Sequence, residues 1–332
     1  MKQHHMLILG CGSVGKRHAR NLAALGCRIS CFDPRKDRRT ELAAETPVAV
    51  SCSDLKKALS VDGIDGVVAA SPTAFHADQT INALDLGLPV LLEKPPAKTL
   101  SEARRMADAA EKTGVAVLLG YTWRWWPPLS RVRELLDSGK IGRIRHVQFH
   151  MSAHLADWHP WEPYQDFFMS SLELGGGALL DESHWIDLML WFFGKPLNLF
   201  GQVEKNSDLQ IETDDNVDVV VTYPDGLRIT LHLDLYGRPH EKFIRFIGEG
   251  GTIFWSAEPN QIRIGLKPEQ EWVQEDFTCD RNDMFVEVAR EFIAVCNGGE
   301  VRTCRLTDGV AVMELIEKIR KSHQEQKAVQ LD

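Results

Sequence analysis

The sequence predicts an α/β protein with an N-terminal Rossmann domain, built on a doubly wound parallel sheet. An α+β domain with a large, open, mostly antiparallel sheet is expected to follow. Strands alternate with helices over about the first third of the chain, which is typical of a parallel sheet. A glycine-rich turn joins the first strand to the first helix, and beyond Leu197 short strands follow one another. The 332 residues suffice for about two domains, which we place at residues 1–121 and 122–332.

Composition and charge exclude several classes of partner. The net charge is −9 without a long basic run, which argues against nucleic acid or an anionic membrane surface. No apolar stretch approaches the roughly 20 residues that span a bilayer, and the N-terminus lacks a signal-peptide pattern. The seven cysteines are odd in number and lack C-x-x-C spacing, so they predict reduced thiols. We therefore expect a cytoplasmic protein that binds no nucleic acid and no membrane.

The first strand and helix frame a G-x-G-x-x-G turn. Residues 6–9 are apolar, Gly10, Gly12 and Gly15 follow, and residues 16–25 have a helical pattern. Gly10 permits the tight turn, Gly12 lets the backbone approach a pyrophosphate, and Gly15 lets helix and strand pack closely. The helix N-terminus offers N–H groups and a positive dipole to the phosphates. This predicts a dinucleotide site that includes Gly10, Gly12, Ser13, Val14 and Gly15.

The next strand, residues 28–32, ends at Asp33, which lies 18 residues after Gly15. A carboxylate at this spacing accepts hydrogen bonds from ribose hydroxyls and repels a 2′-phosphate. We therefore expect NAD rather than NADP as the cofactor. Arg35 is the opposing signal, since a nearby arginine could hold a phosphate.

Further strands at residues 66–70, 89–92 and 115–119 alternate with helices at 74–86 and 101–112. Ligands of such sheets bind beyond the carboxyl ends of the strands. Ser71-Pro72 and Glu93-Lys94 follow two of these ends, so they are expected beside the cofactor. A lysine there can act in proton transfer, whereas the alternative is a solvated turn. For Glu93 we expect a structural role in holding the turn or the lysine.

Residues 120–128 form the expected crossover to the second domain, followed by a helix at 129–138 and a strand at 143–153. The long segment 155–174 is dense in aromatic residues, among them Trp158 and Trp161. Long loops in compact domains tend to be functional, and aromatic faces suit the C–H surfaces of sugars. The alternative is that these rings close a core or an oligomer interface.

A glycine-led apolar helix is expected at residues 178–193, interrupted by Asp181, His184 and Asp187. Spacings of three residues place them near one helix face, and burying them without partners is costly. The functional interpretation is a proton-transfer histidine with a supporting carboxylate. The alternatives are a capping Asp181 with a hydrogen-bonded core His184, or a metal site, for which no second ligand cluster has suitable spacing; we therefore expect no metal.

The remaining chain predicts strands at 216–223, 227–235, 243–247, 252–255 and 261–264, then helices at 282–296 and 306–321. Few helices are available to cover both faces of that sheet. We therefore expect a homodimer or homotetramer through its open face.

These motifs together resemble the Gfo/Idh/MocA family of nicotinamide-dependent sugar and polyol oxidoreductases. The resemblance rests on Gly10–Gly15, Ser71-Pro72 with His76, Glu93-Lys94-Pro95, Gly120-Tyr121 with Arg124 and Pro127, and residues 175–187. It implies that Lys94 contacts the substrate hydroxyl near the nicotinamide. It further implies that His184 accepts the hydroxyl proton, that Asp181 orients substrate or histidine, and that Arg124 contacts cofactor or substrate.

Two departures from the family pattern concern the site. Asp181 lies three residues before His184 rather than four, as in a branch with Asp-x-Ser-His, and Thr122 replaces a frequent Asn. The segment 157–161 also resembles that branch.

We therefore expect an NAD-dependent oxidoreductase acting on a secondary hydroxyl of a sugar, sugar acid or polyol. The rival functions are a redox-assisted glycosidase that retains NAD, and a non-enzymatic NAD-sensing regulator. Three sets of residues are predicted: catalytic Lys94, His184 and Asp181; cofactor-binding Gly10, Gly12, Ser13, Val14, Gly15, Asp33, Arg35, Ser71, Pro72, His76, Glu93, Lys94 and Arg124; and substrate-binding Lys94, Trp158, Trp161, Asp181 and His184.

Overall fold

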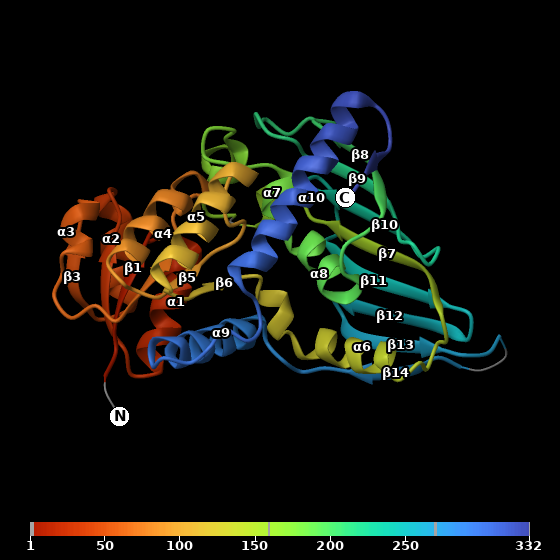
Figure 1. The fold of residues 1–332 in the computed structure, drawn as a ribbon, viewed down its shortest axis with the longest axis horizontal. Coiled ribbons are helices and arrows are strands. Elements are labelled where there is room, and N and C mark those ends of the chain that lie inside the picture. Colours follow the sequence, from red (N-terminus) through yellow and green to blue (C-terminus); the bar gives the residue numbers. More distant parts are fainter. Residues whose placement is uncertain (1–2, 159, 269–270, 332) are drawn as a thin grey trace. The chain divides into compact units, whose positions relative to one another are not determined.

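The computed structural model describes residues 3–158, 160–268 and 271–331. The chain divides into two compact units (Figure 1). The first comprises the residues up to Trp125 together with Asp280–Met313, and the second comprises Trp126–Cys279 with the residues from Glu314 on. The domain division predicted from the sequence, 1–121 and 122–332, did not include this return of Asp280–Met313 to the first unit. The cause of the return is packing, because Val288, Ala289 and Phe292 belong to the hydrophobic core that includes β1 (His5–Leu9).

The first unit contains a six-stranded parallel sheet. Its members are β1, β2 (Arg28–Phe32), β3 (Val48–Cys52), β4 (Gly66–Ala69), β5 (Val90–Leu92) and β6 (Val117–Leu119), in the order β3-β2-β1-β4-β5-β6. Every residue of β1, β4, β5 and β6 is buried, as expected for strands covered on both faces. The strand order reverses between β1 and β4, the point at which such sheets bind ligands.

Helices accompany this sheet in the order α1 (Ser13–Ala24), α2 (Lys36–Glu45), α3 (Leu55–Leu59), α4 (His76–Asp85) and α5 (Leu100–Thr113), with η1 (Thr73–Phe75) before α4 and η2 (Thr122–Trp125) after β6. A sixth helix, α9 (Arg281–Cys296), packs against α1. The side chain of Thr99 accepts from the N–H of Glu102, whose side chain bonds back to the N–H of Thr99. This reciprocal cap satisfies backbone donors and fixes the start of α5.

The second unit is built on a nine-stranded sheet. Its members are β7 (Ile144–Ser152), β8 (Asn198–Glu204), β9 (Asn216–Thr222), β10 (Arg228–Asp234), β11 (Glu241–Gly248), β12 (Gly251–Ala257), β13 (Asn260–Gly265), β14 (Val273–Asp276) and β15 (Val329–Gln330), in the order β14-β13-β12-β11-β7-β10-β9-β8-β15. All neighbours are antiparallel except β7 and β10. The predicted fold class, a parallel Rossmann sheet followed by a mostly antiparallel one, is confirmed.

One face of the nine-stranded sheet is covered by helices (Figure 1). They are α6 (Pro127–Asp137), α7 (Ala178–Asp181), α8 (His184–Phe193) and α10 (Leu306–Glu325). Phe192 of α8 packs edge-on against Phe246 of β11, and Trp185 lies beside Trp255 of β12. The glycine at position 201 of β8 lets Ile319 of α10 approach closely, since an added Cβ would lie 3.0 Å from it.

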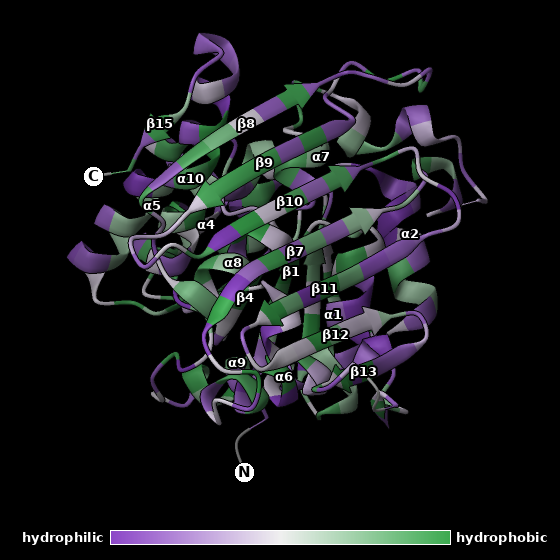
Figure 2. Ribbon diagram, turned by 90° about the vertical axis from the view of Figure 1, so that its right-hand side faces the viewer, coloured by the Kyte–Doolittle hydropathy of each residue, from purple (hydrophilic) through white to green (hydrophobic). Residues whose placement is uncertain are grey.

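Figure 2 shows hydrophilic and hydrophobic residues interspersed along the strands of this sheet. On the face away from the helices, β9 and β10 present mostly half-buried or exposed residues. Phe200, Val220 and Ile247 are exposed there. In the middle of this face His232 lies between two carboxylates, 2.7 Å from Asp218 and 3.0 Å from Asp234. The hydrogen bonds that His232 makes to Asp218 and then to Asp234 outweigh the effect of burial and raise the pKa of His232 to about 9.

All seven cysteines are free thiols. Across the described part of the chain, no helix is both long and apolar enough to cross a bilayer.

Candidate active site

The glycine turn has the shape that a dinucleotide requires. Gly10 has φ +92°, and a side chain there would lie 2.6 Å from the backbone of Ala70 and Ser71. A Cβ on Gly15 would overlap the carbonyl oxygen of Gly10, so only glycine allows α1 to start this close to β1. Gly12 is different, because an added Cβ would meet no atom within 4 Å. The open space over Gly12 fits the approach of a pyrophosphate to the N–H groups at the start of α1, where Ser13 is exposed.

Asp33 is fixed at the end of β2 by the turn itself. Its Oδ2 accepts the N–H of Cys11 at 2.9 Å, and its Oδ1 accepts the N–H of Arg35 at 2.9 Å. Each carboxylate oxygen retains a further lone pair for a ribose hydroxyl. The guanidinium of Arg35 pairs instead with Asp37, at 2.5 Å. The arrangement therefore favours the ribose hydroxyls of NAD over a 2′-phosphate.

His76 ties together the segments that follow β4 and β5. Its Nε2 lies 2.8 Å from the carbonyl oxygen of Ser71, and its Nδ1 lies 2.9 Å from that of Pro95. The ring is buried, and burial lowers its pKa despite these two carbonyls. We call the carboxyl ends of the parallel strands, where the cofactor is expected to bind, the cofactor edge. His76 shapes this edge by holding the backbone at Ser71 and at Pro95. Ser71 and Pro72 are half-buried, and the Ser71 hydroxyl accepts from Gln79 at 3.0 Å.

Glu93 and Lys94 follow β5 directly, as predicted. The N–H of Glu93 donates to Ala69 at 2.9 Å, which joins this point to the end of β4. Glu93 is buried, with Oε1 2.6 Å from Nε2 of His18 and Oε2 accepting the N–H of Lys94 at 3.2 Å. Lys94 itself is half-buried. The structural role expected for Glu93 rests on these contacts, and His18 is a partner that sequence reasoning missed.

Arg124 also belongs to the first unit and is buried. Its Nη1 donates to the carbonyl oxygen of Thr303 at 3.0 Å and lies 3.4 Å from Asp308. The neighbouring Trp125 donates to Glu291 of α9 at 3.1 Å. These contacts anchor the segment after β6 to the returning chain, a role additional to the predicted contact with cofactor or substrate.

Asp181 and His184 lie in the second unit, and the helix that carries them is interrupted. The single helix predicted over 178–193 is wrong, because α7 ends at Asp181 and α8 begins at His184. The N–H of Trp185 donates to the carbonyl oxygen of Glu182, and its indole N–H donates to the carboxylate of Glu182 at 3.2 Å. This tight turn separates the two segments, so the argument from one continuous helix face does not link Asp181 to His184. Asp181 is buried and His184 half-buried.

A half-buried carboxylate that sequence reasoning missed holds the start of α7. Asp214 accepts the N–H of Leu179 at 2.8 Å through its side chain and that of Ala178 at 2.9 Å through its carbonyl oxygen. Gly177 has φ +110°, and any side chain there would meet the Asp214 carboxylate. Burial raises the pKa of Asp214. The signal available in the sequence was the Asp214-Asp215 pair just before a strand, without a pattern that connects it to the glycines.

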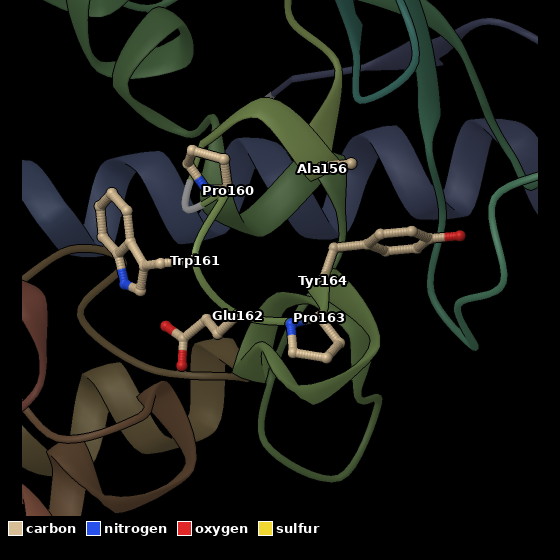
Figure 3. Close-up of a pocket in the computed structure, with 6 residues that line it drawn as sticks. All are labelled: Ala156, Pro160, Trp161, Glu162, Pro163 and Tyr164. Atoms are coloured by element: carbon tan, nitrogen blue, oxygen red, sulfur yellow. The ribbon is translucent and has the colours of Figure 1, made fainter.

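The aromatic segment after β7 contains three short 3-10 helices, η3 (Leu155–Asp157), η4 (Tyr164–Asp166) and η5 (Phe168–Ser170). An open pocket of about 400 Å³ is lined by Ala156, Pro160, Trp161, Glu162, Pro163 and Tyr164 (Figure 3). The indole of Trp161 is 75% exposed, and Figure 3 shows it on the same side of the loop as the Glu162 carboxylate, with Tyr164 on the other side. Trp158 is half-buried and does not line this pocket, and His159 lies outside the described residues.

No group of three or more His, Cys, Asp or Glu side chains in the described ranges is arranged to hold a metal ion.

Comparison with known proteins identifies the family to which this chain belongs. Residues 4–121 match the oxidoreductase family with an NAD-binding Rossmann fold, and residues 129–254 match the GFO/IDH/MocA C-terminal domain. The chain belongs to the Gfo/Idh/MocA family. Its first unit is accordingly an NAD-binding Rossmann domain, and the resemblance inferred from the sequence is confirmed.

Several members of the family are similar to this chain. The scyllo-inositol 2-dehydrogenase (NAD(+)) of Bacillus subtilis (strain 168) is 32% identical over 139 residues, which span 41% of this chain and 41% of that protein. Inositol 2-dehydrogenase 2 of Saccharopolyspora erythraea is 26% identical over 92% of this chain and 88% of its own length. The structure of a levoglucosan dehydrogenase in complex with NADH and levoglucosan has a TM-score of 0.87, with 19% identity and 99% of each chain covered. At that identity the structural match establishes the fold.

Proposed function

We propose that this protein is an NAD-dependent oxidoreductase that transfers a hydride between nicotinamide and a secondary hydroxyl or ketone of a sugar, sugar acid or polyol. The observation that carries the proposal is the position of Lys94. It stands at the carboxyl end of β5, on the edge of the sheet that also bears the glycine turn and Asp33. A half-buried lysine at this edge, in a member of an NAD-binding oxidoreductase family, is suited to act on a substrate beside the cofactor.

The roles of the side chains follow from the charge that develops on the substrate oxygen. When bound, NAD accepts the hydride. The Lys94 ammonium stabilises the oxygen as its negative charge develops, which lowers the barrier most when the cation is already in place. A neutral His184 imidazole accepts the hydroxyl proton, and Asp181 orients the histidine or the substrate.

The choice of NAD follows from Asp33, whose two oxygens face the turn and the backbone of Arg35. A 2′-phosphate brought to this carboxylate would be repelled, whereas ribose hydroxyls can donate to it. Two similar proteins agree with this choice: the scyllo-inositol dehydrogenase is named as NAD(+)-dependent, and the levoglucosan dehydrogenase was crystallised with NADH.

The substrate class rests on the relatives and on the aromatic loop. Those relatives are named for inositol and levoglucosan, which are both polyhydroxylated rings. The exposed indole of Trp161 beside the Glu162 carboxylate offers an apolar face and a hydrogen-bond acceptor, the combination that suits such rings. We place Trp158 and Trp161 among the substrate contacts.

One experiment tests the function against its rivals. The purified protein is analysed for bound cofactor, and polyols, aldoses and sugar acids are screened for NADH formation by absorbance and for glycoside cleavage. NADH formation with a polyol or sugar supports the proposal. Glycoside cleavage without net NADH would indicate the redox-assisted glycosidase, and NAD binding without either activity would indicate the regulator.

Variants then test the assigned roles separately. Lys94→Ala should lower kcat by about 10³-fold or more while NAD affinity changes less than about threefold. His184→Asn should lower kcat by about 10²–10⁴-fold. His5→Asn, at the amino end of β1, is the matched control and should retain the wild-type rate. A Lys94→Ala enzyme with unchanged kcat would overturn the role of the lysine.

We also propose that the outward face of the nine-stranded sheet joins copies of this chain into a homodimer or homotetramer. The exposed Phe200, Val220 and Ile247 on that face support the proposal, since apolar patches of this kind suit an interface. Light scattering after size exclusion measures the assembly. Val220→Arg should dissociate it, and Leu86→Arg, at an exposed leucine of the first unit, should not. A monomeric wild type would refute the proposal.

A further inference from the structure

The buried pair formed by His18 and Glu93 joins two elements of the cofactor edge. His18 is fully buried in α1, three residues after Gly15, and Glu93 follows β5. The 2.6 Å contact from Nε2 to Oε1 therefore links the helix that begins at the glycine turn to the strand that ends at Lys94. The second oxygen of Glu93 accepts the N–H of Lys94 at 3.2 Å. One carboxylate thus holds both the helix and the backbone of the lysine.

Stability alone does not account for a buried pair of polar side chains at this place. The Glu93 carboxylate and the His18 imidazole both lose hydration on burial, and a well-packed apolar pair of similar volume is often as stable. The surroundings are closely packed, because the ring of Phe285 lies edge-on to His18 at 5.6 Å and a Cβ on Gly120 would lie 3.2 Å from the Glu93 carboxylate. A pair that is costly to bury and tightly enclosed points to a role in the charge of the site.

The groups that face Glu93 are mostly cationic or able to become so. They are Arg17 and His18 from α1, His76 from α4 and Lys94 from its own turn. Burial favours the neutral acid, but the hydrogen bond and charge of His18, followed by the charge of Lys94, outweigh it and hold the pKa of Glu93 below its usual value. Arg281 of α9 acts on Arg17 with the same sign of charge. Glu93 is therefore the negative charge that faces Arg17, His18, His76 and Lys94.

We propose that His18 and Glu93 are a positioning pair that fixes the Lys94 turn and keeps the lysine in its ammonium form. Neither residue touches the reacting atoms. Glu93 supplies the counter-charge beside the ammonium, and His18 anchors that carboxylate to α1. The proposal rests on the proposed function, because it assigns to Lys94 the charge that hydride transfer requires.

The test measures the ionisation of Lys94 without relying on turnover. Trace acetic anhydride is applied to the full-length protein between pH 7 and 11, and acetylation at Lys94 is quantified by mass spectrometry. The exposed Lys112 of α5 is the internal standard. Glu93 and Lys94 act on each other through their charges, so removing the negative charge of Glu93 should lower the labelling midpoint of Lys94 by about one pH unit. Glu93→Gln, which keeps the shape of the side chain, is expected to show this shift at Lys94 and none at Lys112.

Turnover supplies a second reading. In Glu93→Gln the alkaline limb of kcat should move to lower pH by the same amount, and kcat at neutral pH should fall about tenfold or more, while NAD affinity stays within about threefold. His18→Gln can still donate to Oε1 and should retain more activity than His18→Leu. His5→Asn is the matched control, since it removes another buried histidine. His5 stands at the start of β1, and its Nε2 lies 2.8 Å from the hydroxyl of Ser30.

An unchanged Lys94 midpoint in Glu93→Gln overturns the inference, whatever the activity. If the wild type oxidises no sugar or polyol, the proposed function fails while the labelling result still decides the inference. If Glu93→Gln does not fold, the comparison of His18→Gln with His18→Leu decides it. A lower Lys94 midpoint in His18→Leu than in His18→Gln supports the pair, and identical midpoints refute it.

Discussion

Two glycines of the same turn should respond to alanine in opposite ways. Gly12 has φ −71° and ψ −171°, values that alanine adopts readily, and its Cβ would meet nothing within 4 Å. Gly12→Ala should therefore leave the free protein intact. It should even stabilise it by about 0.4–1 kcal/mol, because alanine restricts the unfolded chain more than glycine does.

The cofactor affinity of Gly12→Ala should fall sharply, because the methyl group occupies the space through which the pyrophosphate approaches the start of α1. A loss of about 2.7 kcal/mol corresponds to roughly 100-fold in Kd. NAD at 100 times its wild-type Kd stabilises the wild type by about 2.7 kcal/mol but the variant by only about 0.4 kcal/mol. The cofactor-induced rise in Tm should then shrink from roughly 5–10 °C to about 1 °C.

Gly15→Ala should instead destabilise the protein even without cofactor. Its Cβ would overlap the carbonyl oxygen of Gly10 and lie 3.0 Å from the carbonyl carbon, so α1 must move away from β1. Such overpacking costs about 1–3 kcal/mol and should lower Tm without any cofactor by roughly 3–10 °C. Thermal melts of both variants with and without NAD, and titration calorimetry, measure the two effects. A Gly12→Ala protein that binds NAD as tightly as wild type would refute the assignment of this turn to the pyrophosphate.

Three further changes probe the cofactor edge, the start of α7 and the outward sheet face. Asp33→Ala should raise the KM for NAD about tenfold or more and reduce the preference of the enzyme for NAD over NADP. A wild type that prefers NADP would contradict the role of Asp33. Asp214→Ala should lower the free energy of unfolding in urea by about 1–2 kcal/mol, because Leu179 loses its acceptor; an unchanged value would argue against the cap. The pKa of His232 rises to about 9 through its bonds to Asp218 and Asp234, above the unfolded value of 6.5, so its stabilisation is complete below about pH 6.5 and is lost as pH rises through 9. That contribution is at most about 3 kcal/mol. Between pH 6.5 and 9 the free energy of unfolding, measured with urea, should therefore fall more in the wild type than in His232→Asn.

The sequence predicted the parts of the fold whose signals are local. The glycine turn, Asp33 and the Glu93-Lys94 dipeptide are each read from neighbouring residues, and the parallel sheet follows from the alternation of apolar runs with helical patterns. The weaker elements α2, α3 and β3 escaped prediction. In β3 half-buried and exposed residues alternate, so it lacks the continuous apolar run of a central strand such as β1.

The parts that could not be predicted depend on contacts between distant segments. The turn between α7 and α8 is held by Glu182 against Trp185, and glutamate is an ordinary helix residue, so nothing local marks the break. The return of α9 to the first unit depends on a core shared between Phe292 and β1. The link from His18 to Glu93 spans 75 positions, and neither residue type announces the other.

The same contact explains why a glutamate next to the lysine is compatible with a buried strand end. Considered alone, Glu93 would lose its hydration without compensation, and such a group usually protonates. In the folded chain it gains His18, the backbone N–H of Lys94 and the nearby positive charge, and its pKa falls rather than rises. The balance holds only while α1 stays in place, and α1 is placed by the close approach of Gly15 to Gly10. A change at Gly15 should therefore disturb Lys94 as well as cofactor binding, whereas a change at Gly12 should disturb cofactor binding alone.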